Sequence, residues 1–399
     1  MKIAFVVQRY GLEVNGGAEL EARQIAEAVS PYVQVEVLTT CATDYLTWNN
    51  VYAPGVEKLN GVLVRRFAVR QPRDIEAFGR FQNEMFASPR NVYAETRWMA
   101  LQGPDAPELV DFVRARQDDY DLFLFFTYLY ASTWQCLPLV AHKSILFPTA
   151  HDEPPIFLDL FQSLFRLPRG FIFNAPEEDA FVRKTFANEY IPGAVLGVGV
   201  EVPQPPPTPV LDEDFILYLG RIDINKGCGE LFEHFAEYKR ATSDNLKLVL
   251  IGAQAMAVPD RPDIIKIGFM KEERFAWLAK ARALVLPSPF ESLSLVTLES
   301  WALGVPVLVN GRCDVLAGQC QRSNGGLYYT DRDEFVESLR LLRSNEALRL
   351  SLGRNGRGYV TEKYDWNNVT RDYIRFFRAT LERVRATSRG DSGGAGQPA

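Results

Sequence analysis

A proline-rich stretch near the middle of the chain is the feature that most restricts the fold. Residues 203–209 hold five prolines in seven positions. Proline has a fixed φ and no backbone N–H, so this stretch cannot enter a sheet and is typical of a stiff linker between domains. A chain of 399 residues also predicts two or three domains, at about 150 residues per domain. We therefore expect the chain to divide near this linker.

On both sides of the linker, short apolar runs alternate with longer amphipathic stretches. Several runs lack polar alternation, as do strands that are covered on both faces. Strand–helix–strand alternation predicts a parallel, doubly wound sheet in each half. The expected strands are Ile3–Gln8, Val33–Thr40, Val62–Val69, Leu122–Tyr128, Ser144–Thr149, Phe171–Asn174, Ala194–Val200, Phe215–Leu219, Leu246–Ile251, Ile264–Ile267, Ala283–Pro287 and Val305–Val309, and the main expected helices are Ala18–Val29, Gly229–Lys239, Glu272–Ala281, Leu295–Leu303, Glu334–Arg343 and a last one near the C-terminus.

The expected fold class is α/β, with two Rossmann-like doubly wound domains that face a cleft. Ligands of such sheets bind outside the carboxyl ends of the strands, so we expect the sites in the loops that follow strands. The tail carries four glycines, two serines and no bulky apolar residue, which predicts disorder. The predicted boundaries are an N-terminal domain over 1–202, a linker over 203–213, a C-terminal domain over 214–365, a helix over 366–386 and the tail over 387–399.

Composition excludes several classes of function. Forty-four Lys and Arg against fifty Asp and Glu give a net charge of -6, whereas nucleic-acid binders are usually basic. Five scattered cysteines without a CxxC pair and three distant histidines argue against a disulfide framework and a metal centre. No apolar stretch approaches the roughly 18–20 residues that span a bilayer. We expect a cytoplasmic protein with no nucleic-acid partner and no bound metal.

The loop after the first strand ends in two adjacent glycines, Gly16 and Gly17, directly before a helix. Adjacent glycines let the backbone approach a ligand closely, and free N–H groups at a helix start favour anions. This loop predicts either a phosphate contact or a simple turn. It lacks the GxGxxG spacing of a dinucleotide site.

The loop after strand Phe215–Leu219 carries Gly220, Arg221 and Lys226. Arg offers a planar fork and Lys a point charge, a combination that suits a diphosphate. A solvated surface pair is the alternative, and Asp223 could neutralise either cation. Their position at the carboxyl edge of the sheet favours the phosphate interpretation.

The segment 286–302 carries two carboxylates eight residues apart, Glu291 in a loop and Glu299 in a helix that starts near Ser294. The amides of Ser294 and Leu295 are unpaired donors at that helix start. In a continuous helix the two carboxylates would lie about 12 Å apart, beyond the roughly 5–9.5 Å of glycosidase pairs. The spacing favours two carboxylates that hold different parts of one extended ligand, although Glu299 as a simple helix-dipole partner is an alternative.

These residues together resemble a known enzyme family. Glu291 and Glu299 resemble the E-x7-E motif of retaining GT-B glycosyltransferases, family 4 in particular. Gly220-Arg221 with Lys226-Gly227 resembles the family's donor-phosphate loop, and Gly16-Gly17-Ala18-Glu19 its N-terminal GGxE loop. The order of strands and helices agrees from residue 1 to about 385. The resemblance implies that the helix over 366–386 crosses back onto the N-terminal domain.

The resemblance also implies roles for individual residues. Arg221 and Lys226 bind the donor diphosphate, together with the Ser294 and Leu295 amides and the Gly16 loop. Glu291 holds hydroxyls of the transferred sugar, and Glu299 holds the ribose. Phe269 and Met270 lie in the loop that packs along the base. The family often has Gly-Phe-Gly after the first Glu, whereas this chain has Ser292-Leu293-Ser294, residues that we also assign to the donor site; Val198 replaces the usual Asn before Gly199.

Polar residues also follow two strands of the first half. His151 and Asp152 come after strand Ser144–Thr149, and similar enzymes use a His at this place to contact the transferred sugar. A lone His is more often structural, but its place at the carboxyl edge favours a site role. Asn174 ends the next strand and is a weaker acceptor-side candidate.

The segment from Arg65 to Pro104 carries seven arginines among aromatic residues. It could be an acceptor surface, for example for a phosphate-bearing lipid carrier, which would bring peripheral contact with the inner face of a membrane. Ordinary amphipathic helices with solvated arginines and aromatic residues in the core are the alternative, which we favour. The arginines are 65, 66, 70, 73, 80, 90 and 97.

The function implied is transfer of a hexose from a UDP- or GDP-sugar to a hydroxyl acceptor, in bacterial polysaccharide, glycolipid or glycoconjugate biosynthesis. The nucleotide-diphosphate sugar is the co-substrate, no cofactor is expected, and the acceptor is a glycan, a lipid-linked molecule or a small molecule. The chain has no DxD motif near a strand end, so Arg and Lys would replace a divalent ion. A nucleotide-sugar epimerase or hydrolase and a non-catalytic sugar-nucleotide binder are the rival hypotheses.

Overall fold

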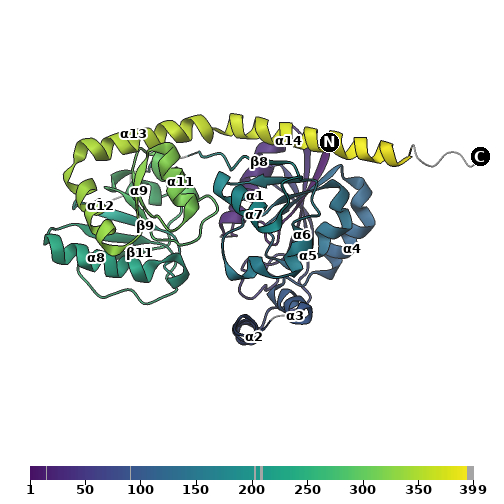
Figure 1. Cartoon of the computed structure of the whole chain (residues 1–399), viewed down its shortest axis with the longest axis horizontal. Helices are drawn as coiled ribbons and strands as arrows, with labels where there is room; N and C mark the ends of the chain where they lie inside the picture. The colour runs from purple at the N-terminus through teal and green to yellow at the C-terminus, as the bar shows by residue number, and fades with distance from the viewer. Residues whose placement is uncertain (15, 90, 202–203, 207–209, 393–399) are drawn as a thin grey trace, which may run out of the picture. The chain divides into compact units, whose positions relative to one another are not determined.

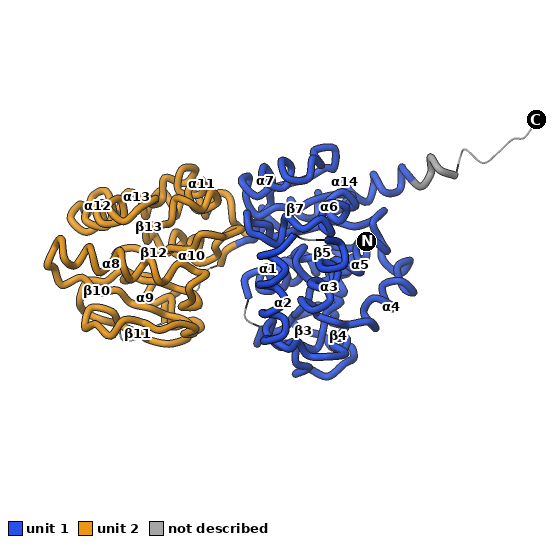
Figure 2. Tube along the Cα trace, turned by 60° about the horizontal axis from the view of Figure 1, so that its bottom comes forward, with its two compact units in different colours: residues 1–199, 367–399 blue, residues 200–366 orange. Residues whose placement is uncertain are grey.

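The chain folds into two compact units. The computed structural model describes residues 1–14, 16–89, 91–201, 204–206 and 210–392. Unit 1 comprises the described parts of 1–199 and 367–399, and unit 2 comprises those of 200–366 (Figure 2). Position 203 and positions 207–209 of the expected linker lie outside the described residues. Each unit contains one sheet flanked by helices (Figure 1), so the α/β class with two Rossmann-like domains is confirmed.

The sheet of unit 1 has eight strands within the described residues, in the order β3-β4-β2-β1-β5-β6-β7-β8. All neighbouring strands are parallel except β3, which pairs antiparallel with β4. Strand order reverses between β1 and β5, the place where open α/β sheets bind ligands. The strands are β1 Lys2–Val6, β2 Gln34–Thr40, β3 Gly55–Leu59, β4 Val62–Phe67, β5 Leu122–Phe126, β6 Ser144–Phe147, β7 Gly170–Phe173 and β8 Gly193–Val195.

The central strands of this sheet are apolar along their whole length because helices cover both faces. Every residue of β5, β6 and β7 is buried. The sequence did not predict β3, whose residues are exposed or half-buried, because it lies at the edge and has no apolar run. The flanking helices are α1 Gly17–Val29, α2 Ile75–Ala87, α3 Val92–Gln102, α4 Pro107–Arg116, α5 Ala131–Cys136, α6 Leu160–Leu164 and α7 Pro176–Phe186, with 3-10 turns η1 Gln117–Asp119, η2 Leu137–Lys143 and η3 Pro154–Phe157.

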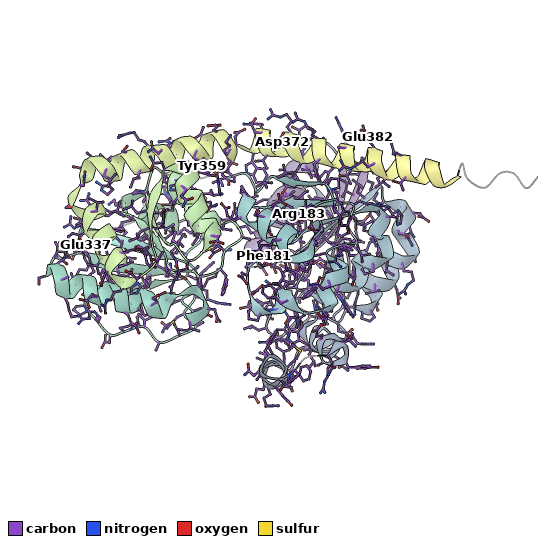
Figure 3. All side chains as sticks on the ribbon, viewed as in Figure 1. Phe181, Arg183, Glu337, Tyr359, Asp372 and Glu382 are labelled. Carbon is purple, nitrogen blue, oxygen red and sulfur yellow. The ribbon has the colours of Figure 1, made fainter. Side chains whose placement is uncertain are left out.

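The C-terminal helix, α14, covers Trp366–Ser392 and belongs to unit 1 from Asn367 onward. Its buried side packs on the sheet: the Phe377 ring lies 6.4 Å from that of Phe5, and the Tyr373 hydroxyl donates to the Gly197 carbonyl at 2.8 Å. Asp372 and the exposed Glu382 lie on the outer side (Figure 3).

The predicted disordered tail over 387–399 was wrong for its first part. The helix continues through Ser392 instead of ending at residue 386, and residues 393–399 lie outside the described residues. Composition argued for disorder, but extending a helix whose preceding turns are already packed costs little compared with starting one.

The sheet of unit 2 has six parallel strands in the described chain, in the order β11-β10-β9-β12-β13-β14. Strand order reverses between β9 and β12, which predicts the ligand site of this unit at their carboxyl ends. The sequence missed α11, β14 and α13. The elements are β9 Phe215–Leu219, β10 Lys247–Ile251, β11 Ile264–Gly268, β12 Leu284–Leu286, β13 Val307–Asn310, β14 Gly326–Tyr329, η4 Ile224–Lys226, α8 Cys228–Thr242, α9 Arg274–Lys280, α10 Leu295–Ala302, α11 Asp314–Ser323, α12 Arg332–Ser344 and α13 Glu346–Lys363.

Candidate active site

The loop after β9 lies directly against the loop after β12. Gly227, between η4 and α8, has φ +74, and a Cβ there would lie 2.3 Å from the Pro287 carbonyl oxygen. Only glycine allows both this conformation and this approach. The close packing places Lys226 beside the segment that carries Glu291.

Lys226 and Glu291 form an ion pair in unit 2. The Lys226 ammonium donates to Glu291 Oε1 at 2.8 Å, and the two side chains are 38% and 17% exposed. Burial lowers the pKa of Lys226, but the charge and hydrogen bond of Glu291 outweigh it, so the pKa is raised. Lys226, predicted for the donor diphosphate, and Glu291, predicted for the transferred sugar, are thus brought together although they lie 65 residues apart in sequence.

Arg221 stands in the same loop but pairs locally. Its Nε lies 3.1 Å from Asp223 Oδ2, while the other carboxylate oxygen of Asp223 accepts the Asn225 amide at 2.8 Å. The alternative in which Asp223 neutralises one of the cations is therefore realised at Arg221. Gly220 begins this loop with φ +150.

The start of α10 lies on the segment that carries Glu291. Ser294 is its N-cap residue, with φ +63 in the left-handed region, and its hydroxyl lies 2.9 Å from that of Thr297. Within the described residues, the amides of Ser294 and Leu295 have no hydrogen-bond acceptor. A helix N-terminus with free N–H groups attracts anions.

Side chains of α11 and β13 fix the loop that carries Glu291 and leads to α10. The Leu293 side chain is buried, and its carbonyl accepts from Gln319 Nε2 at 2.7 Å. Asn310 Nδ2 donates to the Pro287 carbonyl at 3.0 Å. Leu293 therefore anchors the loop through its side chain, whereas Ser292 is half-buried.

Glu299 is fixed by a residue that the sequence did not indicate. Arg274, on α9, donates from Nη2 to Glu299 Oε1 at 2.7 Å. Glu299 Oε2 is buried and has no partner in the described part of the chain. Burial raises the pKa of Glu299, and Arg274 opposes this only in part. Pairing across helices leaves no sequence signal, which is why Arg274 was missed.

The loop after β11 exposes an aromatic ring. Gly268 ends the strand with φ +92, Phe269 follows with 58% of its surface exposed, and Met270 is half-buried. An exposed ring and a thioether offer apolar surface to a flat ligand.

In unit 1, the loop after β1 is filled by its own side chains. Gly16 caps α1, and a Cβ there would lie 2.0 Å from Glu19 Oε2. Glu19 is buried and accepts from Arg9 Nε at 2.9 Å and from Gln8 Nε2 at 2.6 Å. Gly17 begins the helix. The close approach at Gly16 thus accommodates the Arg9–Glu19 pair.

The other candidates of unit 1 differ in their access to solvent. His151 is half-buried, with Nδ1 unpartnered within the described residues, and Asp152 is exposed. Asn174 is only 1% exposed, and its Nδ2 donates to Glu21 at 3.1 Å. Glu178, which the sequence did not indicate, accepts the Asn174 and Ala150 amides at 2.7 Å each, and burial raises its pKa to about 8.

The arginine-rich segment contributes to α2 and α3, which project from the body of unit 1 (Figure 1). Trp98 is buried, and Phe78, Phe81 and Phe86 pack partly buried against the core. Arg97 stacks over Phe81 at 4.6 Å. Position 90 lies outside the described residues, and membrane contact stays a prediction. Four arginines form ion pairs: 65 with Glu36, 66 with Glu57, 70 with Asp105 and 80 with Glu76.

Among the described residues, no cluster of three or more His, Cys, Asp and Glu could hold a metal ion. None of the helices that the structure describes combines the length and apolar character needed to cross a bilayer.

Solved structures of known proteins share the fold of this chain. Sucrose-phosphate synthase from Thermosynechococcus elongatus aligns with a TM-score of 0.70 at 17% identity, over 96% of this chain and 99% of that one. Anabaena HepE, solved with UDP and glucose, aligns with a TM-score of 0.67 at 14% identity, over 95% of this chain and all of the other. At such identities the likeness shows the fold, which is that of the GT-B glycosyltransferases.

Similarity in sequence covers less than half of the chain in each of the following matches. Residues 213–345 match the family model described as "Glycosyl transferases group 1". An uncharacterized glycosyltransferase of Methanocaldococcus jannaschii is 27% identical over 43% of this chain and 47% of its own length. The MMP alpha-(1->4)-mannosyltransferase of Mycolicibacterium hassiacum is 33% identical over 30% and 29%. The chain thus spans about half or less of these curated relatives.

Proposed function

We propose that the protein is a retaining glycosyltransferase that moves a hexose from a UDP- or GDP-sugar to a hydroxyl acceptor, in polysaccharide, glycolipid or glycoconjugate biosynthesis. The observation that carries the proposal is the Lys226–Glu291 pair beside the start of α10. The match of residues 213–345 to the glycosyltransferase model supports the same assignment.

The reaction places negative charge on the leaving diphosphate and positive charge on the sugar. Preorganised cations and amides that face developing charge are often the largest catalytic contribution. Lys226, Arg221 and the amides of Ser294 and Leu295 supply such groups. The leaving phosphate takes the acceptor's proton on the same face, so no separate nucleophile is required.

Binding of the donor diphosphate replaces two ion pairs of unit 2. Lys226 is held by Glu291 and Arg221 by Asp223. A diphosphate carries more negative charge than either carboxylate and accepts several hydrogen bonds, so it displaces both. Its binding frees Glu291 to accept hydrogen bonds from hydroxyls of the transferred sugar.

Glu299 has one carboxylate oxygen available for a ribose hydroxyl of the donor nucleotide. Arg274 fixes Oε1, while Oε2 is buried without a partner among the described residues. A buried acceptor without a donor is costly, and a ribose hydroxyl supplies one. Phe269 and Met270 then pack against the base.

We assign the acceptor to the loops that follow strands of the unit 1 sheet. His151 and Asp152 lie after β6, where a hydroxyl acceptor or the transferred sugar would contact them, whereas Asn174, after β7, is buried and donates to Glu21. Glycan, lipid-linked and small-molecule acceptors, a cytoplasmic location and contact with a membrane remain proposals.

A thermal-shift panel of nucleoside diphosphates tests the function, because a ligand that binds the folded state raises the melting temperature. UDP or GDP should give the largest shift, and its hexose conjugates should then be turned over only when an acceptor is added. Rapid release of free sugar or of an epimer without acceptor would establish the hydrolase or epimerase instead. Binding without any turnover would establish a non-catalytic binder, and NMR of the product's anomeric proton tests retention.

A further inference from the structure

Arg73 is a half-buried arginine that forms no ion pair with a carboxylate of the described residues. Its Nη2 donates to the carbonyl and to the side-chain oxygen of Gln102, the latter at 3.1 Å. Its Nε is buried without an acceptor, and no Asp or Glu lies within ion-pair distance, among the residues that the structure describes. A guanidinium has five N–H donors, so most of its hydrogen-bonding capacity is unused.

The surroundings of Arg73 are aromatic. Its Cζ lies 4.6 Å from the centre of the Phe78 ring and 5.3 Å from that of Trp48. Tyr130 packs edge-on against Trp48 at 5.3 Å, and Tyr45 packs partly buried on the same cluster. Arginine stacked on rings keeps its in-plane N–H groups free for a planar or tetrahedral oxyanion.

This cluster lies at the ligand-binding edge of the unit 1 sheet. Arg73, Trp48 and Tyr130 come from the loops that follow β4, β2 and β5, and Arg9 comes from the loop after β1. These four strands are consecutive neighbours in the sheet and include the place where strand order reverses.

Among the described residues, Asp44 attracts Arg73 through space but forms no ion pair with it. Arg9 is paired with Glu19 and donates to the Thr43 carbonyl at 2.8 Å. Asp44 accepts from the amides of Leu46 and Thr47 and from the Thr47 hydroxyl, so its oxygens are engaged in its own loop. A cation withdrawn from water without a partner is unfavourable, and an anionic ligand removes that cost.

We propose that the acceptor of this enzyme is a sugar that carries an anionic group, a phosphate monoester or a carboxylate, and that Arg73 binds this group. The inference rests on the proposed function, since it names the substrate class of that transfer. The half-buried Tyr45 provides the apolar surface against which a sugar ring packs, whereas Trp48 is buried and contacts Arg73 from within the unit. Arg73 acts in binding and contributes no group to the chemical step.

The test is calorimetric titration of the full chain with glucose, glucose 6-phosphate, glucuronate and inorganic phosphate, each with and without saturating nucleoside diphosphate. At least one charged probe should bind tenfold or more tightly than glucose, and the better of the two charged sugars identifies phosphate or carboxylate. Arg73→Gln should weaken that binding at least tenfold. Arg97→Gln is the matched control, because Arg97 also stacks on a ring but lies on α3.

Equal binding of glucose and the charged sugars, no binding of any charged probe, or equal affinities of Arg73→Gln and wild type would overturn the proposal. If Arg73→Gln does not fold, Arg73→Lys keeps a positive charge without the planar fork, and it should weaken the charged probe several-fold. Nucleoside diphosphate affinity is measured in every variant. If wild type binds no nucleoside diphosphate, the proposed transferase function is refuted. Tight binding of a charged sugar would then still support the Arg73 site.

Discussion

At the scale of single residues, the site is built from charges that are already paired before any ligand arrives. Lys226 and Arg221 are each held by a carboxylate, and Glu299 is held by Arg274. Such pairs are partly exposed, and pairs of this kind contribute about 0–1 kcal/mol to stability. They are therefore easily exchanged for a ligand, which suits binding more than stabilisation.

Glu299→Gln should weaken nucleoside diphosphate binding roughly tenfold or more, because a hydrogen bond to a charged acceptor is worth about 1.5–3 kcal/mol. Binding of inorganic pyrophosphate should not change, since it has no ribose. Calorimetry with both ligands measures the difference, and Glu337→Gln, an exposed change on α12, is the control. Equal losses for both ligands would remove Glu299 from the ribose site.

Glu178 should make unit 1 less stable as pH rises from about 5 to 8. Its pKa is raised to about 8 by burial, so the folded state holds a proton that the unfolded chain releases near pH 4.3. The stabilisation that comes from this bound proton is complete below the pKa of the unfolded chain, and it is lost as pH rises through the pKa of the folded state. The free energy of unfolding should fall by at most about 1.4 kcal/mol per pH unit.

Denaturant unfolding of wild type and Glu178→Gln across this pH range tests the assignment. Gln cannot ionise, so the variant should show a flatter dependence, whatever its stability at one pH. Parallel pH profiles for the two proteins would show that Glu178 is not the group that titrates.

At the scale of elements, strand positions could be predicted closely and pairings could not. β5 and β9 were found because they are continuous apolar runs buried on both faces. β3 was missed because its residues face solvent, and α11 and β14 because polar residues and glycines interrupt their patterns. Lys226, Glu291 and Glu299 were predicted as site residues. The pairs Lys226–Glu291 and Arg274–Glu299 join different elements, and local sequence does not encode such pairings.

Gly227→Ala tests whether the contact between the β9 and β12 loops positions the site. The added Cβ meets Pro287 at 2.3 Å with φ +74, so we expect a loss of about 1–3 kcal/mol in stability and weaker nucleoside diphosphate binding. Gly358→Ala on α13, where a Cβ meets nothing within 4 Å, is the control. Unchanged binding in a folded Gly227→Ala protein would contradict this role.

At the scale of the whole molecule, the sequence predicted two sheets with binding edges, and both edges carry unusual charges. In unit 2 these are the paired cations of the loop after β9, and in unit 1 they are Arg73 and its aromatic neighbours. The fold alone is shared by enzymes of many substrates, so the substrate class must be inferred from these side chains.

Turnover should persist in excess EDTA, because we propose that Lys226 and Arg221 take the place of a divalent ion at the leaving diphosphate. The initial rate with the nucleotide sugar identified by thermal shift should change less than twofold when EDTA is added. A strict requirement for Mg²⁺ or Mn²⁺ would refute metal-independent transfer while leaving the donor assignment intact.

We propose that unit 2 clamps a diphosphate through Lys226. The Kd of the nucleoside diphosphate should be compared with that of its monophosphate in wild type, Lys226→Ala and Lys363→Ala, whose exposed pair with Glu362 also spans 2.8 Å. Wild type and Lys363→Ala should prefer the diphosphate at least tenfold, about 1.4 kcal/mol or more, whereas Lys226→Ala should bind both ligands about equally. An undiminished preference in Lys226→Ala would contradict the proposal.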